Sequence, residues 1–255
     1  MFNIGLISSQ TPFIPSLLSG GVFWLESSDT SPANINSSSG SVSGWTDKFG
    51  NGNDAIQLSG GDQPQTGLNT INGKNVITFQ GDPQYLEIPY DASIDFRYAG
   101  TFFIVFRNTL TNLNTRVFCR INNQDNPSIT FNSLSSGSVS FGIQQNISSP
   151  TNSSNVDFGT TTANTPTISA MGFELQTQDT ILGKNNNNAI VSADASGTAE
   201  TIRDMGVIRI GAQKTSTTNR FLIGDIGEFI AYDRLLSTSE INAIVSYLNN
   251  KWSVF

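Results

Sequence analysis

The segment GWTDKFGNGNDAIQ, residues 44–57, contains one tryptophan, two aspartates, three glycines and two asparagines. Glycine and asparagine tolerate the positive φ angles of tight turns, and an aspartate accepts hydrogen bonds from nearby backbone N–H groups in Asx turns. Calcium loops and sugar contacts use the same residue types, so these two alternatives stay open. We expect the segment to be a structural signature of the fold, made by the following residues: Trp45, Asp47, Gly50, Asn51, Gly52, Asn53 and Asp54.

The composition of the whole chain is typical of short strands joined by polar turns. Of the 255 residues, 13% are charged and 37% are hydrophobic, and much of the remainder is Ser, Thr, Asn and Gly. All-β sandwiches and barrels of this length often form a single unit. We therefore expect one all-β domain over residues 19–255, preceded by a separate segment at residues 1–18.

Strand patterns separated by turn residues recur between residues 22 and 232. In NGKNVITF, Asn72-Gly73 precedes a strand and favours a hairpin turn. TFFIVF, residues 101–106, is continuously apolar and should be buried on both faces. SVSFGI, residues 138–143, alternates and should have one solvated face. We expect the polar tract from Ser148 to Thr165 to form a long loop.

One helix is predicted near the C-terminus, in LSTSEINAIVSYLNNKW. Ser237 and Glu240 have the spacing of a capping box, in which each side chain bonds the other residue's free backbone N–H. Apolar residues follow at positions i, i+3, i+4 and i+7, so that one helix face packs on the sandwich. These residues are Ile241, Ile244, Val245 and Leu248.

Five blocks of the chain resemble, in their order, the laminin-G-like branch of the concanavalin A-like lectin/glucanase jelly rolls: FWLESSD, SGWTDKFGNGNDAIQ, NGKNVITFQGDPQYLEI, TFFIVFR and GDIGEFIAYDRLLSTSEINAIVSYLNNKW. The resemblance covers about residues 22 to 253. It implies a jelly-roll sandwich of two curved antiparallel sheets with one short C-terminal helix. Such domains occur as accessory modules of secreted enzymes, in adhesins, and in phage and viral structural proteins.

Glu228, in the last of these blocks, is a further structural candidate. Strand alternation places its side chain on the same face as Ile226, Ile230 and Tyr232, partly inward. A buried carboxylate needs hydrogen-bond partners. We therefore expect Glu228 to hold a neighbouring loop through backbone N–H groups.

Charge and composition exclude several classes of function. The net charge is −7, with no His and only 13 Lys plus Arg, which disfavours nucleic-acid binding. Without His, the chain has no Ser-His-Asp triad and no imidazole zinc site. The single cysteine, Cys119, is expected to be a buried thiol. The N-terminus has no basic n-region and is interrupted by Pro12 and Pro15, so no signal peptide is predicted. No 18-residue apolar stretch exists, so no membrane span is predicted.

Glycoside hydrolysis requires two carboxylates about 5 to 10 Å apart. Asp225 and Glu228 are three positions apart, so alternation along a strand should point them to opposite faces. Asp91 and Asp95 lie in PYDASIDFRY, which has no clean strand pattern. The sequence therefore predicts no catalytic residue and no enzyme.

Two groups of polar residues are candidates for ligand binding. The sequence NNQDNPS supplies carboxylate and amide oxygens on a loop but no closely spaced carboxylate pair, so any calcium binding would be weak and a solvated turn is the alternative. Planar amides such as glutamine side chains bond sugar hydroxyls. No cofactor and no dedicated metal site is predicted. The candidate residues are Asn122, Asn123, Asp125, Asn126, Gln144 and Gln145.

Residues 1–18 are apolar, and Pro12 and Pro15 favour an extended conformation. An apolar arm left in water tends to find a partner surface. We expect this arm to dock onto a neighbouring capsid or tail subunit; the alternative is that it forms an edge strand of its own sandwich.

These observations lead to three functional hypotheses. The first is a non-enzymatic subunit on the virion surface, a capsid decoration, head-fibre or tail-associated protein that adheres to host-surface glycans, because the jelly-roll resemblance comes without an export signal. The second is a carbohydrate-binding module of a cellular or secreted surface protein. The third is a glycoside hydrolase whose carboxylates are unrecognised. A homo-oligomer is compatible with all three.

Overall fold

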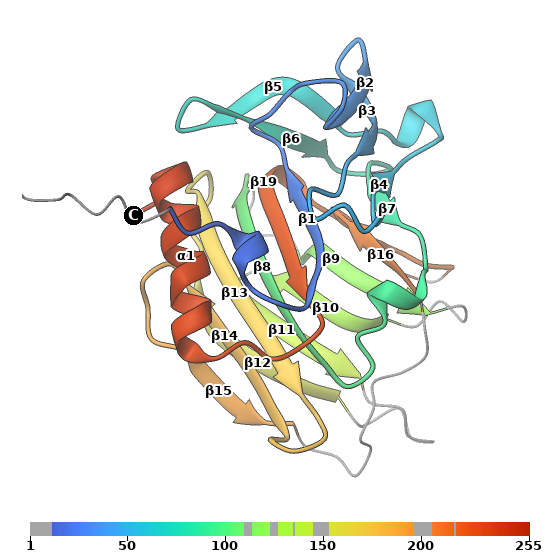
Figure 1. The fold of residues 1–255 in the computed structure, drawn as a ribbon. Helices are drawn as coiled ribbons and strands as arrows, with labels where there is room; N and C mark the ends of the chain where they lie inside the picture. Colours follow the sequence, from blue (N-terminus) through green and yellow to red (C-terminus); the bar gives the residue numbers. More distant parts are fainter. Residues whose placement is uncertain are drawn as a thin grey trace, which may run out of the picture.

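Two layers of β-strands are stacked face to face, and one α-helix packs on the outside of one layer (Figure 1). The computed structural model describes residues 12–109, 114–122, 127–134, 136–144, 153–195, 206–216 and 218–255. In these segments the strand pairs are antiparallel. The predicted all-β sandwich with a short C-terminal helix is therefore confirmed.

The first sheet carries the helix. Its central strand, β19, pairs with β8 on one side and with β6 and then β1 on the other. β13, β14 and β15 extend the sheet beyond β8, and β5 extends it beyond β6. The bounds are β1 (Gly21–Glu26), β5 (Gln65–Ile71), β6 (Lys74–Gln80), β8 (Ala99–Asn108), β13 (Thr167–Glu174), β14 (Thr180–Asn185), β15 (Val191–Asp194) and β19 (Ile223–Tyr232).

The second sheet runs in the order β12, β11, β10, β9, β16, β7, β4, β3 and β2. It joins the first sheet where Ser41 of β3 pairs with Gln65 of β5. The bounds are β2 (Ile35–Ser38), β3 (Ser41–Trp45), β4 (Ala55–Ile56), β7 (Leu86–Ile88), β9 (Thr115–Asn122), β10 (Pro127–Ser133), β11 (Ser138–Gln144), β12 (Ser153–Thr160) and β16 (Gly206–Ile210).

A small hairpin of β17 (Ala212–Lys214) and β18 (Asn219–Phe221) lies against the outward face of β9. There the thiol of Cys119 donates to the carbonyl oxygen of Ala212 at 3.2 Å. Cys119 is buried, as predicted, and burial raises the pKa of its thiol to about 12. It is therefore an uncharged packing residue. Three short 3-10 helices complete the described elements: Pro15–Leu17, Gly60–Asp62 and Ala92–Ile94.

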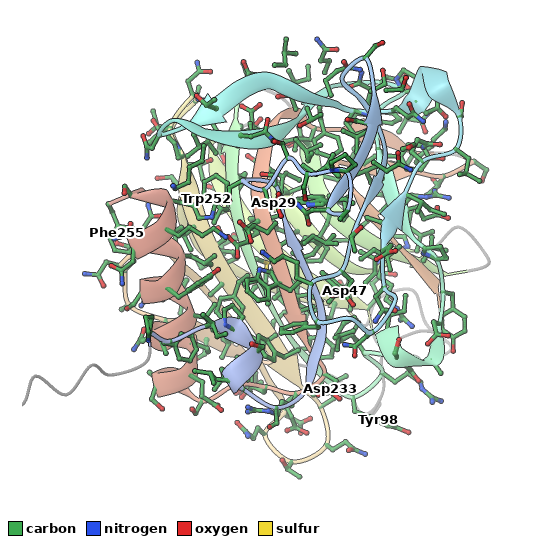
Figure 2. All side chains as sticks on the ribbon, turned by 45° about the horizontal axis from the view of Figure 1, so that its top comes forward. Asp29, Asp47, Tyr98, Asp233, Trp252 and Phe255 are labelled. Carbon is green, nitrogen blue, oxygen red and sulfur yellow. The ribbon has the colours of Figure 1, made fainter. Side chains whose placement is uncertain are left out.

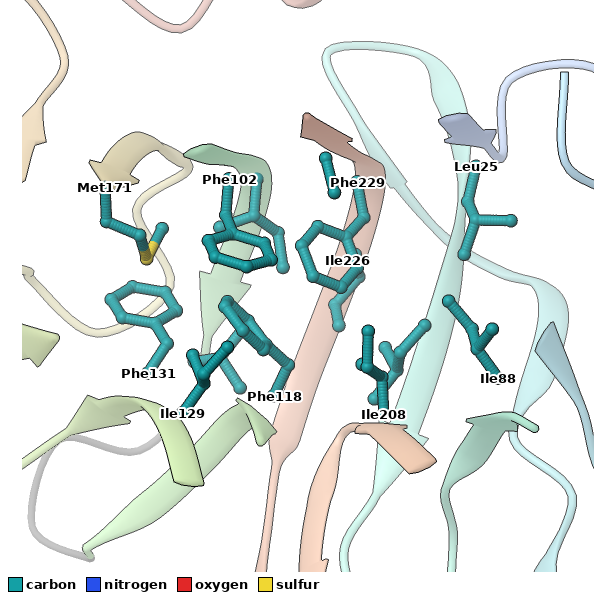
Figure 3. Packing of buried hydrophobic residues seen from close by; sticks show 14 of the residues in the cluster. Leu25, Ile88, Phe102, Phe118, Ile129, Phe131, Met171, Ile208, Ile226 and Phe229 are labelled. Atoms are coloured by element: carbon teal, nitrogen blue, oxygen red, sulfur yellow. The ribbon is translucent and has the colours of Figure 1, made fainter. Parts of the chain in front are cut away.

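The main hydrophobic core fills the space between the two sheets (Figure 3). Phe118 of β9 contacts Phe229 of β19 with ring centroids 4.7 Å apart, which joins the centres of the two layers. Each buried side chain of this size contributes about 1.5 to 3 kcal/mol through removal of apolar surface from water. Most of the buried phenylalanine side chains thus stabilise the packing of one sheet on the other.

β8 shows why the first sheet needs a cover on its outer face. Phe102, Ile104 and Phe106 point into the core between the sheets, whereas Phe103 and Val105 point outward and belong to a second hydrophobic cluster. The predicted burial of residues 101–106 on both faces is confirmed. The outer cover is helix α1.

Helix α1 (Thr238–Trp252) packs its apolar face on that second cluster. The capping box predicted for Ser237 and Glu240 is present, with both reciprocal hydrogen bonds formed. The predicted apolar positions are all buried, and Trp252 joins them: Ile241, Ile244, Val245, Leu248 and Trp252.

The prediction for strand β19 is wrong at one position. Ile226 pairs with Phe106 and Glu228 with Val105, so Gly227 is an extra residue that forms a β-bulge. The bulge interrupts alternation, and Glu228 therefore faces the helix side together with Ile230, whereas Ile226 faces the core. A side chain at position 227 would collide with Trp252, 2.8 Å from an added Cβ.

Two predictions for the second sheet also need correction. The tract predicted to be a loop contains β12, because Val156 and Phe158 alternate with exposed polar residues and pack into the core. Residues 148–152 of that tract lie outside the described segments. In β11, Val139 and Phe141 point into the core as predicted. Ser140 on the other face is buried against Asn132 instead of being solvated.

The N-terminal segment begins, in the described part, at Pro12. Phe13 and Leu18 pack against the second cluster of this same chain, and the hydroxyl of Tyr232 donates to the carbonyl oxygen of Pro15 at 2.9 Å. Residues 12–18 thus lie beside α1 and form no edge strand. Residues 1–11 lie outside the described segments, and docking of the arm onto another subunit stays a prediction.

Candidate functional site

The loop after β3 is built around the carboxylate of Asp47. Oδ1 of Asp47 accepts hydrogen bonds from the backbone N–H groups of Trp24 and Phe49, both at 2.9 Å, and Oδ2 accepts from that of Asn51 at 2.9 Å. Oδ1 of Asp54 accepts from the N–H of Asp47 at 2.8 Å. Figure 2 shows Asp47 next to β1. The carboxylate therefore fastens the loop to the first strand.

Two asparagines complete this attachment. The side-chain amides of Asn51 and Asn53 both donate to the carbonyl oxygen of Val22, at 2.9 and 2.8 Å. Gly50 and Gly52 adopt φ angles of 79° and 80°, which L side chains rarely adopt. Trp45, at the end of β3, is fully buried in the main core. This geometry is the one expected of a structural signature.

The same loop also forms one wall of an open groove of about 420 Å³. The opposite wall is the segment from Pro89 to Asp91, which Ser93 connects to the loop through a hydrogen bond from its hydroxyl to Oδ1 of Asn53 at 3.0 Å. The groove is lined by Asn51, Gly52, Asn53, Asp54, Ile56, Pro89, Tyr90 and Asp91. The signature loop thus also lines a groove on the surface.

The groove contains an aromatic ring and two carboxylates. Tyr90 is 39% exposed. Asp54 and Asp91 each accept a backbone N–H group at Oδ1. The hydrogen bond from the Ser93 N–H lowers the pKa of Asp91, which keeps it charged at neutral pH. Charged carboxylates accept hydrogen bonds from hydroxyl groups, and an exposed ring can stack on the apolar face of a sugar.

A second groove of about 210 Å³ continues from the first at Ile56. It is lined by Ile56, Gln57, Leu58, Tyr85 and Glu87. The guanidinium of Arg209 lies 5.5 Å and the ammonium of Lys214 5.2 Å from the centroid of the Tyr85 ring. Arg209 also bonds Glu87 at 2.9 Å. The two grooves share Ile56 of β4, and their tyrosines, Tyr85 and Tyr90, come before and after β7 in the sequence.

The residues predicted to bind a ligand are largely outside the described part. Asn123, Asp125, Asn126 and Gln145 are not described, and for Asn122 only the backbone, as the last residue of β9, is placed. Gln144 ends β11 and is half-buried. These positions stay predictions. The groove at Tyr90 was not predicted as a site; its sequence signal was the clustering of Pro, Tyr and Asp in PYDASIDFRY.

Glu228 lies at the centre of a buried cluster beneath α1. Its carboxylate accepts hydrogen bonds from the indole N–H groups of Trp24 and Trp252, at 2.6 and 2.7 Å, and from the hydroxyl of Tyr247 at 3.3 Å. Lys251 lies 2.9 Å from it and 2.7 Å from Glu26. The predicted bonds to backbone N–H groups are therefore wrong: the bulge at Gly227 turns Glu228 toward side chains of α1 and β1.

The other carboxylates considered for catalysis are also engaged. Asp225 accepts from Thr78 at 2.7 Å and Asn69 at 3.0 Å and pairs with Arg107. The bulge places it on the same face as Glu228, contrary to the predicted alternation. Asp95 pairs with Arg97 at 2.6 Å. Within the described segments, no group of three or more His, Cys, Asp or Glu residues is arranged to hold a metal ion.

Solved structures of several proteins share this fold. The binding domain of Paraclostridial Mosquitocidal Protein 1 matches with a TM-score of 0.64 at 16% identity, covering 90% of this chain and 53% of that one. Botulinum neurotoxin type C, in a study of its interaction with two ganglioside molecules, matches with a TM-score of 0.65 at 12% identity, covering 92% and 53%. Trypanosoma rangeli sialidase in complex with sialic acid matches with a TM-score of 0.64 at 12% identity, covering 96% and 36%.

These likenesses show a shared fold. This chain spans about half the length of the toxin chains and about a third of the sialidase. No model of a known protein family matches the chain, and no curated protein sequence matches it. In the described segments, no helix is long and apolar enough to cross a membrane.

Proposed function

We propose that this domain binds glycans, without hydrolysing them, through the groove at Tyr90. The observation that carries the proposal is that the exposed Tyr90 ring lines an open groove together with two carboxylates, Asp54 and Asp91. The stacked ring would fix the orientation of a sugar, and the carboxylates would accept hydrogen bonds from its hydroxyl groups. The fold is shared with botulinum neurotoxin type C, which interacts with gangliosides, and with a sialidase in complex with sialic acid; this supports glycans in general as the class of ligand, although the sugars bound by those two proteins are anionic.

The charge of the groove indicates which sugars it accepts. Among the described residues, the lining includes Asp54 and Asp91 and no lysine or arginine. An anionic sugar placed there would meet like charges, which weaken binding most at low ionic strength. We therefore expect neutral sugars to bind this groove.

The test uses two exposed tyrosines as a matched pair. Tyr90, in the groove, is 39% exposed, and Tyr98, which lines neither groove, is 42% exposed. Loss of a stacked ring should lower affinity about tenfold, so Tyr90→Ala should weaken binding on a glycan array or by titration, while Tyr98→Ala should not. Absence of any bound glycan, or equal effects of the two substitutions, would contradict the proposal.

The finer proposal is that a virus particle displays this domain as a decoration, head-fibre or tail-associated subunit. The resemblance to jelly rolls of phage and viral structural proteins supports it, as does an N-terminal segment that runs over the surface beside α1. Detection of the chain in washed, purified particles tests it, and absence from them would refute it. The alternative is a carbohydrate-binding module of a cellular or secreted protein, which the same groove would serve.

A hydrolase is the third candidate and has less support. In this groove the candidate acid and nucleophile are Asp54 and Asp91, because both carboxylates line it, whereas Asp225 and Glu228 are engaged elsewhere. Incubation with neutral polysaccharides should release no reducing sugar. Release that is lost in Asp54→Asn would establish catalysis instead of binding.

A further inference from the structure

The outward face of the second sheet contains a buried cation. Arg116 of β9 is only 8% exposed, and its Nε donates to Oε1 of Gln213, in β17, at 2.7 Å. The glutamine amide is neutral and leaves the positive charge of the guanidinium uncompensated. Removal of a charge from water costs several kcal/mol unless the charge is paired. A buried arginine is therefore expected to lie against a carboxylate.

Most described arginines do have such a partner. Their guanidinium nitrogens lie between 2.5 and 3.9 Å from an aspartate or glutamate oxygen: Arg97, Arg107, Arg120, Arg209 and Arg234. Among the described residues, neither Arg116 nor Arg220 has a carboxylate at this distance. These two arginines thus differ from the others.

Arg220 lies beside Arg116. Gln213 and Arg220 are directly opposite each other in the β17–β18 hairpin, and opposed residues of an antiparallel pair extend from the same face. The face that bonds Arg116 through Gln213 therefore also carries Arg220. Burial and the positive charge of Arg220 lower the pKa of Arg116 to about 10. Two like charges meet here, and no described carboxylate lies between them.

Asn132 adds a polar atom that lacks a partner. It lies opposite Arg116 in the register of β9 and β10. Its Nδ2 donates to Oγ of Ser140 at 3.1 Å, whereas its Oδ1 is buried without a hydrogen-bond donor in the described part of the chain. A ligand that carries a hydroxyl beside a negative group would supply both the missing donor and the missing charge.

We propose that Arg116 and Arg220, with Gln213 and Asn132 beside them, bind an oxyanion group, a carboxylate or a sulfate ester carried by a sugar. Guanidinium groups bind such anions through paired, charge-assisted hydrogen bonds. The negative charge of the anion would compensate the two positive charges and so offset the free-energy cost of burying them without a counter-charge. This site shares no residue with the groove at Tyr90, so it does not depend on the function proposed for that groove.

Inorganic sulfate and galacturonic acid are the probes. Binding is measured by titration calorimetry and by the melting temperature, with sodium chloride used to match ionic strength. Sulfate should raise the melting temperature of the wild type above the chloride control. Arg220→Gln, at the less buried arginine, should weaken sulfate binding about tenfold. Because it removes like-charge repulsion, it should also raise the melting temperature in chloride alone.

The matched control is Arg97→Gln, which changes an exposed arginine paired with Asp95. It should keep the affinity of the wild type, as should Tyr90→Ala in the separate groove. Binding of sulfate alone identifies a sulfate ester as the ligand group, and binding of galacturonic acid alone identifies a carboxylate. No shift beyond the chloride control, or equal losses in Arg220→Gln and Arg97→Gln with both variants folded, would overturn the proposal.

Discussion

The outward faces of the two sheets each contain a buried charged side chain, and the two charges differ in how they are compensated. On the first sheet, Glu228 is fully buried under α1 and accepts hydrogen bonds from two indoles, with Lys251 2.9 Å away. On the second sheet, Arg116 is almost as deeply buried, and the side chain that bonds it in the described part of the chain is the neutral amide of Gln213. The first charge is satisfied by its own chain. The second lacks a counter-charge among the described residues.

This difference indicates that the Glu228 cluster stabilises the fold, whereas Arg116 is available to bind a ligand. Donors and a cation around Glu228 leave no bonding capacity for a ligand, so the cluster holds the helix on the sheet. Among the described residues, Arg116 has no carboxylate partner, and Asp54 and Asp91 line an open groove, so a ligand can reach or complement these groups. Predictions about the Glu228 cluster therefore concern the stability of the protein, whereas predictions about Arg116 and the groove at Tyr90 concern ligand binding.

The largest effect is expected for Glu228→Ala. The substitution leaves the buried indoles of Trp24 and Trp252 without their acceptor and leaves Lys251 with Glu26 as its remaining carboxylate partner. Breaking a buried charge pair in this way typically costs about 3 to 5 kcal/mol. Urea unfolding followed by circular dichroism measures the free energy of unfolding.

Glu228→Gln is the control for that measurement. It keeps an oxygen acceptor and most of the volume, so its loss should be smaller. Burial raises the pKa of Glu228, and Lys251 opposes this effect. A cost below about 1 kcal/mol for the alanine variant would mean that the cluster adds no more than an exposed ion pair does.

Leu248→Ala tests the apolar half of the same interface. Leu248 is fully buried between α1 and the first sheet. Emptying such a position should cost about 2 to 5 kcal/mol, depending on how far the neighbours collapse into the cavity. The same unfolding experiment applies. A negligible loss would show that α1 does not stay docked on the sheet in solution.

The layers of this fold could be predicted from the sequence, because burial of one face of a strand or helix requires apolar residues at a regular spacing. TFFIVF predicts a strand covered on both faces, and the spacing from Ile241 to Leu248 predicts the helix that covers one of them. The error in β19 has a specific cause. One extra residue at Gly227 shifts the period, and every side chain before it changes face relative to those after it. An isolated glycine inside a strand pattern was the available signal.

The surface sites were less predictable from the sequence. The turn chemistry of Asp47 and Gly50 is local and can be read from neighbouring residues. The groove instead joins Asp54 to Tyr90 across a distance of 36 positions, and the arginine site joins β9 to β18. No periodicity encodes such pairs, because they depend on which strands meet in the sandwich. The missing counter-charge of Arg116 is likewise visible only once its neighbours are placed.

The pH dependence of stability should reveal the partner of Glu228 in the cluster, Glu26. Burial alone would raise the pKa of Glu26, but hydrogen bonds from Lys251, Lys48 and Ser28 outweigh it and lower that pKa from 4.5 to about 2. The stabilising contribution is therefore complete above pH 4.5 and is lost as the pH falls toward 2. A shift of this size corresponds to at most about 3 kcal/mol. Glu26→Gln should flatten this part of the stability curve, and an unchanged slope would contradict the assignment.

The smallest expected effect is at the start of α1. The hydroxyl of Ser237 accepts the N–H of Glu240, and the carboxylate of Glu240 accepts the N–H of Ser237 at 2.8 Å. Ser237→Ala removes one half of this box and should cost about 1 kcal/mol. Ser246→Ala, on the exposed face of the same helix, should be neutral or slightly stabilising because alanine has the higher helix propensity. If the two serine variants unfold at the same urea concentration, the cap contributes nothing, and side-chain packing beneath α1 alone holds the helix over Glu228.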